Sequence, residues 1–153
     1  MKQQDLADIE AIKQLKARYF RCLDKKLWDE FGEVFTEDGH LDSSGDAPHA
    51  VATGRAAIVA LVGGAVGEAV TVHHGHMPEI EIVAPDRARG IWAMEDYLEF
   101  PGDPPALIVH GRGHYFEEYG RQDGQWRIKS LRLERLWLQH NGRRIVPPRR
   151  PEA

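Results

Sequence analysis

Cysteine is almost absent from this chain of 153 residues, and Cys22 is the only one. A single cysteine excludes an intrachain disulfide, so nothing implies an oxidising compartment. Long hydrophobic runs are lacking too, and none approaches the ~20 residues that cross a bilayer as a helix. The chain starts with polar residues 2–5 and shows no signal peptide. We therefore expect a cytoplasmic protein.

Strong charge of one sign and the common catalytic motifs are also missing. The net charge of −4 gives no reason to expect nucleic acid or an anionic membrane as a partner. The sequence contains no phosphate-binding loop, no Gly-x-Ser-x-Gly and no paired CxxC. A hydrophobic fraction of 42% and a charged fraction of 29% are typical of a globular protein. We predict one domain over residues 1–153.

Helical periodicity comes first in the chain and strand-like segments follow. The predicted helices are about 5–24, 26–36 and a third that begins at 54 and ends near 63–64 or 67. The predicted strands are 39–43, 69–83, 87–100, 106–120 and 125–139. This order indicates an α+β fold, with N-terminal helices packed on a curved, mostly antiparallel sheet around a cone-shaped core. Residues 141–153, rich in proline and arginine, are predicted to be an extended or disordered tail.

The first helix carries an apolar stripe with polar residues at one end. Tyr19 belongs to the stripe, whereas Lys16 and the other basic residues are predicted to fall largely outside it. Asp24 ends the helix, where the helix dipole prefers cations. It is either a capping residue or a functional carboxylate. The stripe consists of Leu6, Ile9, Ile12, Leu15, Tyr19 and Leu23.

Asp96 interrupts the apolar face of a predicted strand. Its face is shared by Ala88, Gly90, Trp92, Met94, Leu98 and Phe100. A buried carboxylate is costly unless a cation, a hydrogen bond or water meets it. Arg135 is the one charge on a face of the last strand that it shares with Leu131, Leu133 and Trp137. The two can form a structural ion pair or a polar group inside a cavity, and both readings stay open.

Three histidines lie together in His73-His74-Gly75-His76. Strand alternation lets at most two share a site, and no third ligand is evident, so a metal is not expected. One histidine acting as acid or base is favoured, since imidazole titrates near neutral pH. Alternation joins His74 and His76 to the apolar residues downstream, but a bulge at Gly75 or Pro78 would bring His73 inward instead.

Several segments resemble SnoaL-like proteins of the NTF2-like superfamily, above all the bile acid 7α-dehydratases and, more distantly, scytalone dehydratase. The resemblance covers about residues 5–138 and is carried by four segments: 8–24, 73–80, 88–96 and 124–126. It implies a cone of helices against a curved sheet with a pocket inside. It also implies a catalytic set, which by local alignment falls on Tyr19, Asp24, His73, Asp96 and Arg135. A second tyrosine of those enzymes would fall near Ser43, where this chain has none.

The resemblance implies elimination of water from a hydroxylated cyclic ketone, which is steroid-, bile-acid- or polyketide-like, without a metal or organic cofactor. A ketosteroid-isomerase-like double-bond isomerase and a non-catalytic module that binds small molecules are the alternatives. The expected partner is a small hydrophobic cyclic substrate, and relatives suggest a homo-oligomer, a trimer or dimer, built on the outer face of the sheet. The predicted apolar wall of the pocket is Trp28, Phe31, Trp92, Met94 and Phe116.

Overall fold

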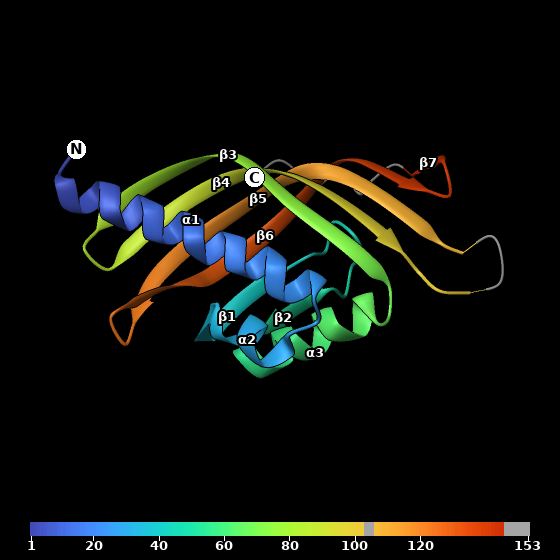
Figure 1. Cartoon of the computed structure of the whole chain (residues 1–153), viewed down its shortest axis with the longest axis horizontal. Helices are drawn as coiled ribbons and strands as arrows, with labels where there is room; N and C mark the ends of the chain where they lie inside the picture. The colour runs from blue at the N-terminus through green and yellow to red at the C-terminus, as the bar shows by residue number, and fades with distance from the viewer. Residues whose placement is uncertain (103–105, 146–153) are drawn as a thin grey trace.

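The computed structural model describes residues 1–102 and 106–145, in which three helices pack on one mixed sheet (Figure 1). The helices are α1 (Gln3–Asp24), α2 (Trp28–Glu33) and α3 (Arg55–Val66). The strands are β1 (Phe35–Asp42), β2 (Val51–Thr53), β3 (Val70–Ala84), β4 (Arg87–Glu99), β5 (Ile108–Gln122), β6 (Gln125–His140) and β7 (Arg143–Ile145). The predicted α+β class is confirmed.

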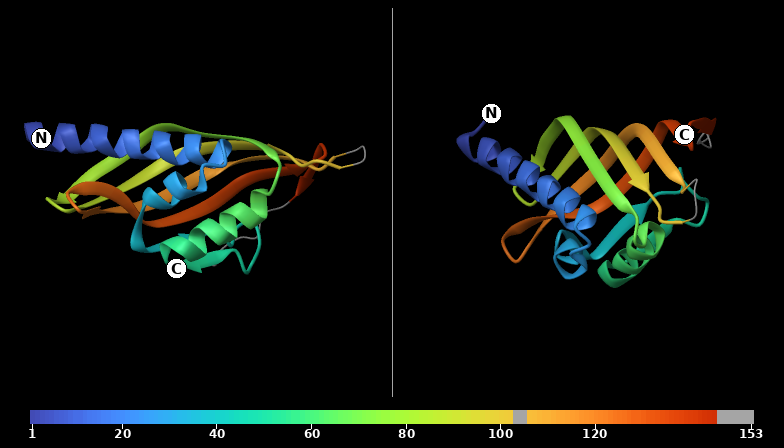
Figure 2. Two further views of the ribbon diagram at one scale, coloured as in Figure 1. Left: turned by 60° about the horizontal axis from the view of Figure 1, so that its bottom comes forward. Right: turned by 45° about the vertical axis from the view of Figure 1, so that its right-hand side comes forward.

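The strands lie in the order β2-β1-β6-β5-β4-β3 across the sheet, and β7 pairs with β6. Neighbouring strands are antiparallel except β1 and β6, which are parallel. Within the described residues β2 and β3 are free edges, so the sheet curves without closing. α1 lies along one face of the sheet, and α2 and α3 lie near the C-terminal end of α1 (Figure 2). This is the expected cone, with one core between helices and sheet.

The apolar stripe of α1 forms much of that core. Ile12, Leu15 and Tyr19 are buried, whereas Leu6 is 57% exposed, so the stripe begins after the first turn. The prediction that Lys16 falls outside the stripe is wrong, because Lys16 is completely buried. It lies four residues after Ile12 and three before Tyr19, which is the spacing of one helix face. No helix in the described part of the chain is long and apolar enough to cross a membrane.

The short elements differ most from expectation. β1 begins at Phe35, ahead of the strand predicted from residue 39, and its register against β6 shifts between Phe35 and His40. β2 and β7 were not predicted, because strands of three residues carry almost no alternation. Part of the predicted tail is ordered, since β7 pairs with β6. The remainder, 146–153, lies outside the described residues.

Candidate active site

Asp24, the last residue of α1, holds His73 of β3 at two points. Its Oδ1 accepts a hydrogen bond from the ring Nδ1 of His73 at 2.6 Å, and its Oδ2 accepts from the backbone N–H of His73 at 2.9 Å. The hydroxyl of Thr71 donates to the same Oδ1 at 2.9 Å. A proton on Nδ1 is thereby fixed toward Asp24, which leaves the lone pair of Nε2 on the other side of the ring.

Asp24 is ionised in this arrangement. Burial alone would raise the pKa of its carboxyl, but the hydrogen bonds from the side chain and backbone of His73, with that from Thr71, hold the pKa below its ordinary value. The charged carboxylate can therefore stabilise a proton taken up by His73. An acid and base pair of this kind moves protons at neutral pH.

A bulge in β3 turns His73 inward, as the resemblance required. The register against β4 shifts between His76 and Glu79, where β3 has one more residue than its partner. Met77 lies in this bulge with a positive φ of 39°. Upstream of the bulge Thr71 and His73 face the core, and downstream Ile80 and Ile82 do. The simple alternation that joined His74 and His76 to Ile80 and Ile82 is therefore wrong, and the alternative, a bulge that brings His73 inward, is confirmed.

Asp96 and Arg135 form the ion pair predicted from strand alternation. The guanidinium of Arg135 donates to both carboxylate oxygens of Asp96, at 2.6 and 2.7 Å, and Asp96 is buried. Asp46, on the loop before β2, accepts a further hydrogen bond from Arg135 Nε at 2.7 Å. The two carboxylates raise the pKa of Arg135 against the opposing effect of burial. Asp96 Oδ2 also lies 3.9 Å from Nε2 of His73, close enough to attract an imidazolium there.

These groups converge on a cavity of about 330 Å³ inside the cone, which His73, Asp96, Arg135 and Tyr19 all line. Tyr115 of β5 lines it as well, and its ring centroid is 6.1 Å from that of Tyr19. The structure thus brings together the five residues expected from the resemblance, with Asp24 reaching the cavity through His73. The rest of the wall is mainly apolar: Leu23, Leu41, Leu61, Val62, Ala65, Val66, Leu98, Phe100, Val109, Leu133 and Leu138.

Tyr115 is one of the polar cavity residues that the sequence did not predict; the others include Asp46, His49 and His140. Burial raises the pKa of both Tyr19 and Tyr115 far above the ordinary value, with nearby carboxylates adding to the effect, so both are neutral hydrogen-bond donors. The available signal was strand alternation, since Tyr115 shares a face with Gly111 and Gly113. Because Gly111 has no side chain, this face leaves space for the Asp96–Arg135 pair. A Cβ on Gly111 would be 2.2 Å from Arg135 Nη1.

The expected apolar wall lies elsewhere. Phe31 is in the core beside Tyr19, and Trp28 packs edge-on against Phe31. Trp92 donates its indole N–H to Tyr119, and Met94 places its sulfur 3.7 Å from Arg135 Nη1. The prediction for Phe116 is wrong, because this residue lies on the outer face under the guanidinium of Arg132. None of these five residues is among those that line the cavity.

The predicted face of the last strand is correct up to Arg135 and wrong at Trp137. β6 pairs with β5 through Gly113↔Arg135 and Arg112↔Trp137, which leaves Leu136 as an extra residue. After this bulge Leu138, not Trp137, lines the cavity. Trp137 packs on the outer face against Arg112 and His110.

His74 and His76 point away from the cavity, with ring centroids 6.0 Å apart. Among the residues that the structure describes, no group of three or more histidine, cysteine or acidic side chains is arranged to hold a metal ion.

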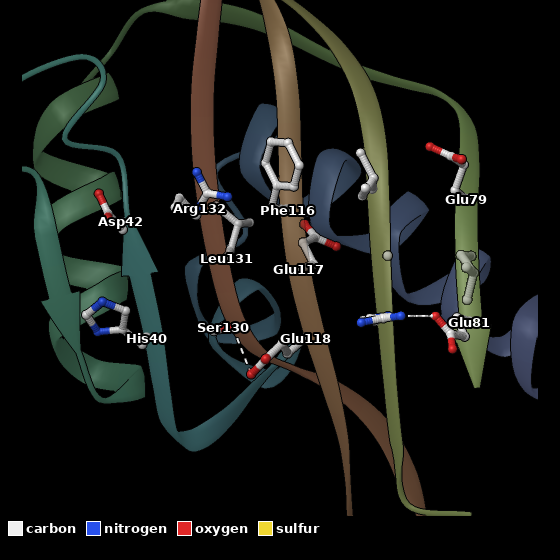
Figure 3. Close-up of a pocket in the computed structure, with 14 residues that line it drawn as sticks. His40, Asp42, Glu79, Glu81, Phe116, Glu117, Glu118, Ser130, Leu131 and Arg132 are labelled. Carbon is white, nitrogen blue, oxygen red and sulfur yellow. Dashed lines mark hydrogen bonds and ion pairs between the residues drawn. The ribbon is translucent and has the colours of Figure 1, made fainter. Parts of the chain in front are cut away.

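A larger hollow, of about 630 Å³, lies on the outer face of the sheet (Figure 3). Its charged groups engage their own neighbours: Arg89 donates to Glu81, and Ser130 donates to Glu118. The Asp24–His73 pair and the two tyrosines face the inner cavity, so the inner cavity is the candidate active site. The homo-oligomer expected on the outer face stays a prediction.

Comparison with known proteins agrees with this geometry. The sequence profile of the SnoaL-like domain matches residues 4–132. The chain belongs to the SnoaL-like family. The resemblance to SnoaL-like proteins, which segments 8–24, 73–80, 88–96 and 124–126 carry, is therefore confirmed.

Relatives of this SnoaL-like protein carry several enzyme names. FGR4 of Gibberella zeae, provisionally named a cyclase, is 27% identical over 135 residues, covering 82% of this chain and 89% of that protein. A crystal structure from Novosphingobium aromaticivorans, provisionally named a scytalone dehydratase, superposes with a TM-score of 0.79 at 27% identity and covers 99% of this chain and 100% of its own. Hexachlorocyclohexane dehydrochlorinase LinA-type3 from Novosphingobium barchaimii has a TM-score of 0.75 over 94% of this chain and 97% of its own; at 21% identity it shows the shared fold alone.

Proposed function

We propose that this SnoaL-like protein is a cofactor-independent lyase that eliminates water from a hydroxylated cyclic ketone by acid–base catalysis. The Asp24–His73 pair carries the proposal. Its 2.6 Å hydrogen bond fixes the proton on Nδ1 and leaves Nε2 free at the wall of a mainly apolar cavity. The relation is of the same kind as that between the histidine and the aspartate of hydrolase triads.

The reaction follows from this geometry in two steps. Nε2 of His73 takes a proton from the carbon next to the substrate carbonyl, and the C–H electron pair forms a double bond while the carbonyl electrons move to oxygen. The resulting enolate then re-forms the carbonyl and expels the hydroxyl from the neighbouring carbon. That hydroxyl leaves as water with the proton from Nε2, so His73 is restored. Asp24 stabilises the imidazolium between the two steps.

The other cavity groups have supporting roles. Tyr19 is kept neutral and donates a hydrogen bond to the enolate oxygen or to the departing hydroxyl. Asp96, 3.9 Å from Nε2, adds to the stabilisation of the imidazolium. Arg135 holds Asp96 at this distance and orients it.

The size and charge of the cavity narrow the substrate. About 330 Å³ is at the small end of the ~300–1,000 Å³ that hold drug-sized ligands, which favours one or two rings over a four-ring steroid. Asp46 and Asp96 both contact the guanidinium of Arg135, so a substrate carboxylate would be repelled at that side of the cavity. We propose a compact, uncharged cyclic hydroxyketone.

An isomerase would use the same proton transfer without losing hydroxide. The product distinguishes the two: an isomerase keeps the mass of its substrate, whereas a dehydratase releases water and leaves a new conjugated bond. A binding module without catalysis does not need a hydrogen-bonded acid and base pair at the wall of its cavity. The close Asp24–His73 contact therefore favours an enzyme.

The test is turnover of a two-ring β-hydroxyketone such as 3-hydroxytetralone, followed by mass spectrometry for loss of water. We expect His73→Ala to lower kcat by ~10²–10⁴-fold, the usual contribution of a positioned acid or base. His74→Ala is the matched control, because its ring is on the outer face of the same strand. Turnover by His73→Ala within about threefold of the wild-type rate would refute the assignment.

A further inference from the structure

Lys16 and Glu117 form a fully buried ion pair that the proposed mechanism does not use. Lys16 Nζ of α1 donates to Glu117 Oε1 of β5, and both side chains are 0% exposed. Taking two charges out of water costs several kcal/mol per ion, and apolar side chains of the same volume are often as stable. Stability alone therefore gives no reason for this pair.

Its position gives one. Lys16 Nζ lies 3.8 Å from the ring centroid of Tyr19 and 3.8 Å from that of Tyr115. These are the two tyrosines that line the active-site cavity. A cation on the face of a ring is attracted to the π electrons, most strongly where water is excluded. Burial lowers the pKa of Lys16, whereas the charge of Glu117 and its hydrogen bond oppose this effect and favour the ammonium form. That ammonium contacts both rings and draws electron density from both phenols.

The acidic end of the pair is anchored on the side away from the cavity. Glu117 Oε2 accepts the hydroxyl of Tyr119, whose oxygen accepts the indole N–H of Trp92 at 2.9 Å. Neither Glu117 nor Tyr119 lines the cavity. The ion pair thus has a direction, with its positive end against the two cavity tyrosines and its negative end fixed in the core.

We propose that Tyr19 and Tyr115 form a two-donor site for an anionic oxygen, an enolate or a phenolate, and that Lys16 is the positioning residue that sets and strengthens both donors. Burial keeps both phenols protonated by raising the pKa of each, although a hydrogen bond from Tyr115 lowers the pKa of Tyr19 in part. The two hydroxyls therefore lie together, and an anionic oxygen between them would take the proton that Tyr115 donates to Tyr19 as well as the proton of Tyr19. Donors aimed at developing charge in a site without water are the strongest contributors to enolate stabilisation. The role in turnover rests on the proposed function, but binding of an anionic oxygen does not.

The binding test compares 1-naphthol with naphthalene, which has the same two rings and no oxygen, across the pH range in which free 1-naphthol becomes a phenolate, so that binding of the anionic form is measured. Fluorescence titration measures both affinities, and their ratio reports the donor site apart from the apolar wall. We expect Lys16→Met combined with Glu117→Gln to lower the preference for 1-naphthol by about tenfold, since a desolvated cation on two rings is lost. The double change leaves no unpaired charge in the core. Naphthalene affinity should not move.

Three further variants make the outcome decisive. Lys16→Gln with Glu117→Gln replaces the ion pair by a neutral hydrogen-bonded pair, and it serves if the first double variant does not fold. Tyr115→Phe should lose the preference for 1-naphthol in the same way. Tyr119→Phe removes a contact at the negative end but leaves Lys16 on both rings, so it should keep the preference within about threefold.

A folded double variant that retains the wild-type ratio would overturn the role of Lys16. A Tyr115→Phe variant that retains it would overturn the two-donor site. These outcomes can be told apart from failure of the proposed function. If the protein prefers 1-naphthol through its tyrosines but releases no water from any hydroxyketone, the two-donor site stands and the lyase activity is refuted.

Discussion

Asp24 contacts His73 through both of its oxygens, at the ring Nδ1 and at the backbone N–H, 2.6 and 2.9 Å away. The contact therefore sets the tautomer of the ring and its position at once. An amide at position 24 would keep the size but lose the charge, and its NH₂ group could donate to Nδ1 and favour the wrong tautomer. We expect Asp24→Asn to lower kcat by ~10²–10⁴-fold, measured by steady-state turnover.

Thr71→Val is the matched control for that change. It removes a hydroxyl that donates to the same carboxylate at 2.9 Å but leaves both contacts with His73. Loss of one such hydrogen bond should lower kcat by about tenfold at most. If the two variants were equally mild, Asp24 would be a cap of α1 and not part of the proton transfer.

The lowered pKa of Asp24 gives its contribution to stability a defined pH dependence. The folded pKa lies below 3.8, so the contribution is fully present above the unfolded value and is lost as the pH falls through the folded value. We expect the difference in free energy of unfolding between wild type and Asp24→Asn to shrink as the pH falls below ~4 and the carboxyl of Asp24 is protonated. Urea unfolding at a series of acidic pH values measures it. A difference that grew as the pH fell below ~4 would contradict an ionised Asp24.

Gly111 leaves the space that the Asp96–Arg135 pair occupies. A Cβ there would lie 2.2 Å from Arg135 Nη1 and 2.6 Å from Asp96 Oδ1, so Gly111→Ala must push the pair apart. Forcing an extra methyl group into a packed site typically costs ~1–3 kcal/mol, and we expect a loss of stability of that size together with loss of turnover. Gly120→Ala in the same strand is the control, since its nearest neighbour would be an ordinary contact at 4.0 Å. Equal stability of the two variants in urea unfolding would contradict this account.

Alternation along the strands predicted much of this site, and it failed where the alternation is interrupted. Asp96 and its apolar neighbours face inward over the whole of β4, because that strand pairs with β5 in unbroken register. In β3 and β6 an extra residue reverses the faces midway. Nothing in the sequence marks Leu136 as a bulge. Strand alternation therefore predicted Trp137 on the inner face of the sheet and Leu138 on the outer face. For β3, only the resemblance to known enzymes selected His73.

The buried charges were the other failure. Lys16 lies at the spacing of the apolar stripe, so its predicted place outside the stripe was wrong on position alone. A lysine is rarely buried without a partner, and the sequence did not reveal one. Its partner Glu117 is far away in sequence, and only tertiary structure brings the two together. The same holds for Tyr115, whose role depends on Lys16 and Tyr19 together. Long-range pairs of this kind cannot be predicted from a single sequence.

The charge of the cavity can be changed by substitution of Asp46. It lines the cavity and accepts hydrogen bonds from Arg135, but its side chain is 37% exposed, so the loop can lose this charge without exposing the core. We expect Asp46→Asn to strengthen binding of 1-naphthoate by about threefold to tenfold, because one repelling carboxylate is gone. Naphthalene affinity, measured by the same titration, is the control. No change for the carboxylate would contradict repulsion of a ligand carboxylate by Asp46.

The bulge at Met77 lets both halves of β3 turn their apolar side chains to the core. This effect should depend on the extra residue in the strand and not on the side chain of Met77. Met77 is 92% exposed with a φ of 39°, a conformation that glycine adopts without strain, so Met77→Gly should change the free energy of unfolding by no more than ~1 kcal/mol.

Deleting Met77 removes the extra residue and forces one half of the strand to turn over. Either His73 leaves the cavity, or Glu79 and Glu81 enter the core. Burying unpaired carboxylates is prohibitive, so we expect the deletion to lose more than about 3 kcal/mol in urea unfolding, or to fold with His73 outside and without turnover. A deletion variant with wild-type stability and turnover would show that His73 reaches the cavity by some means other than this bulge.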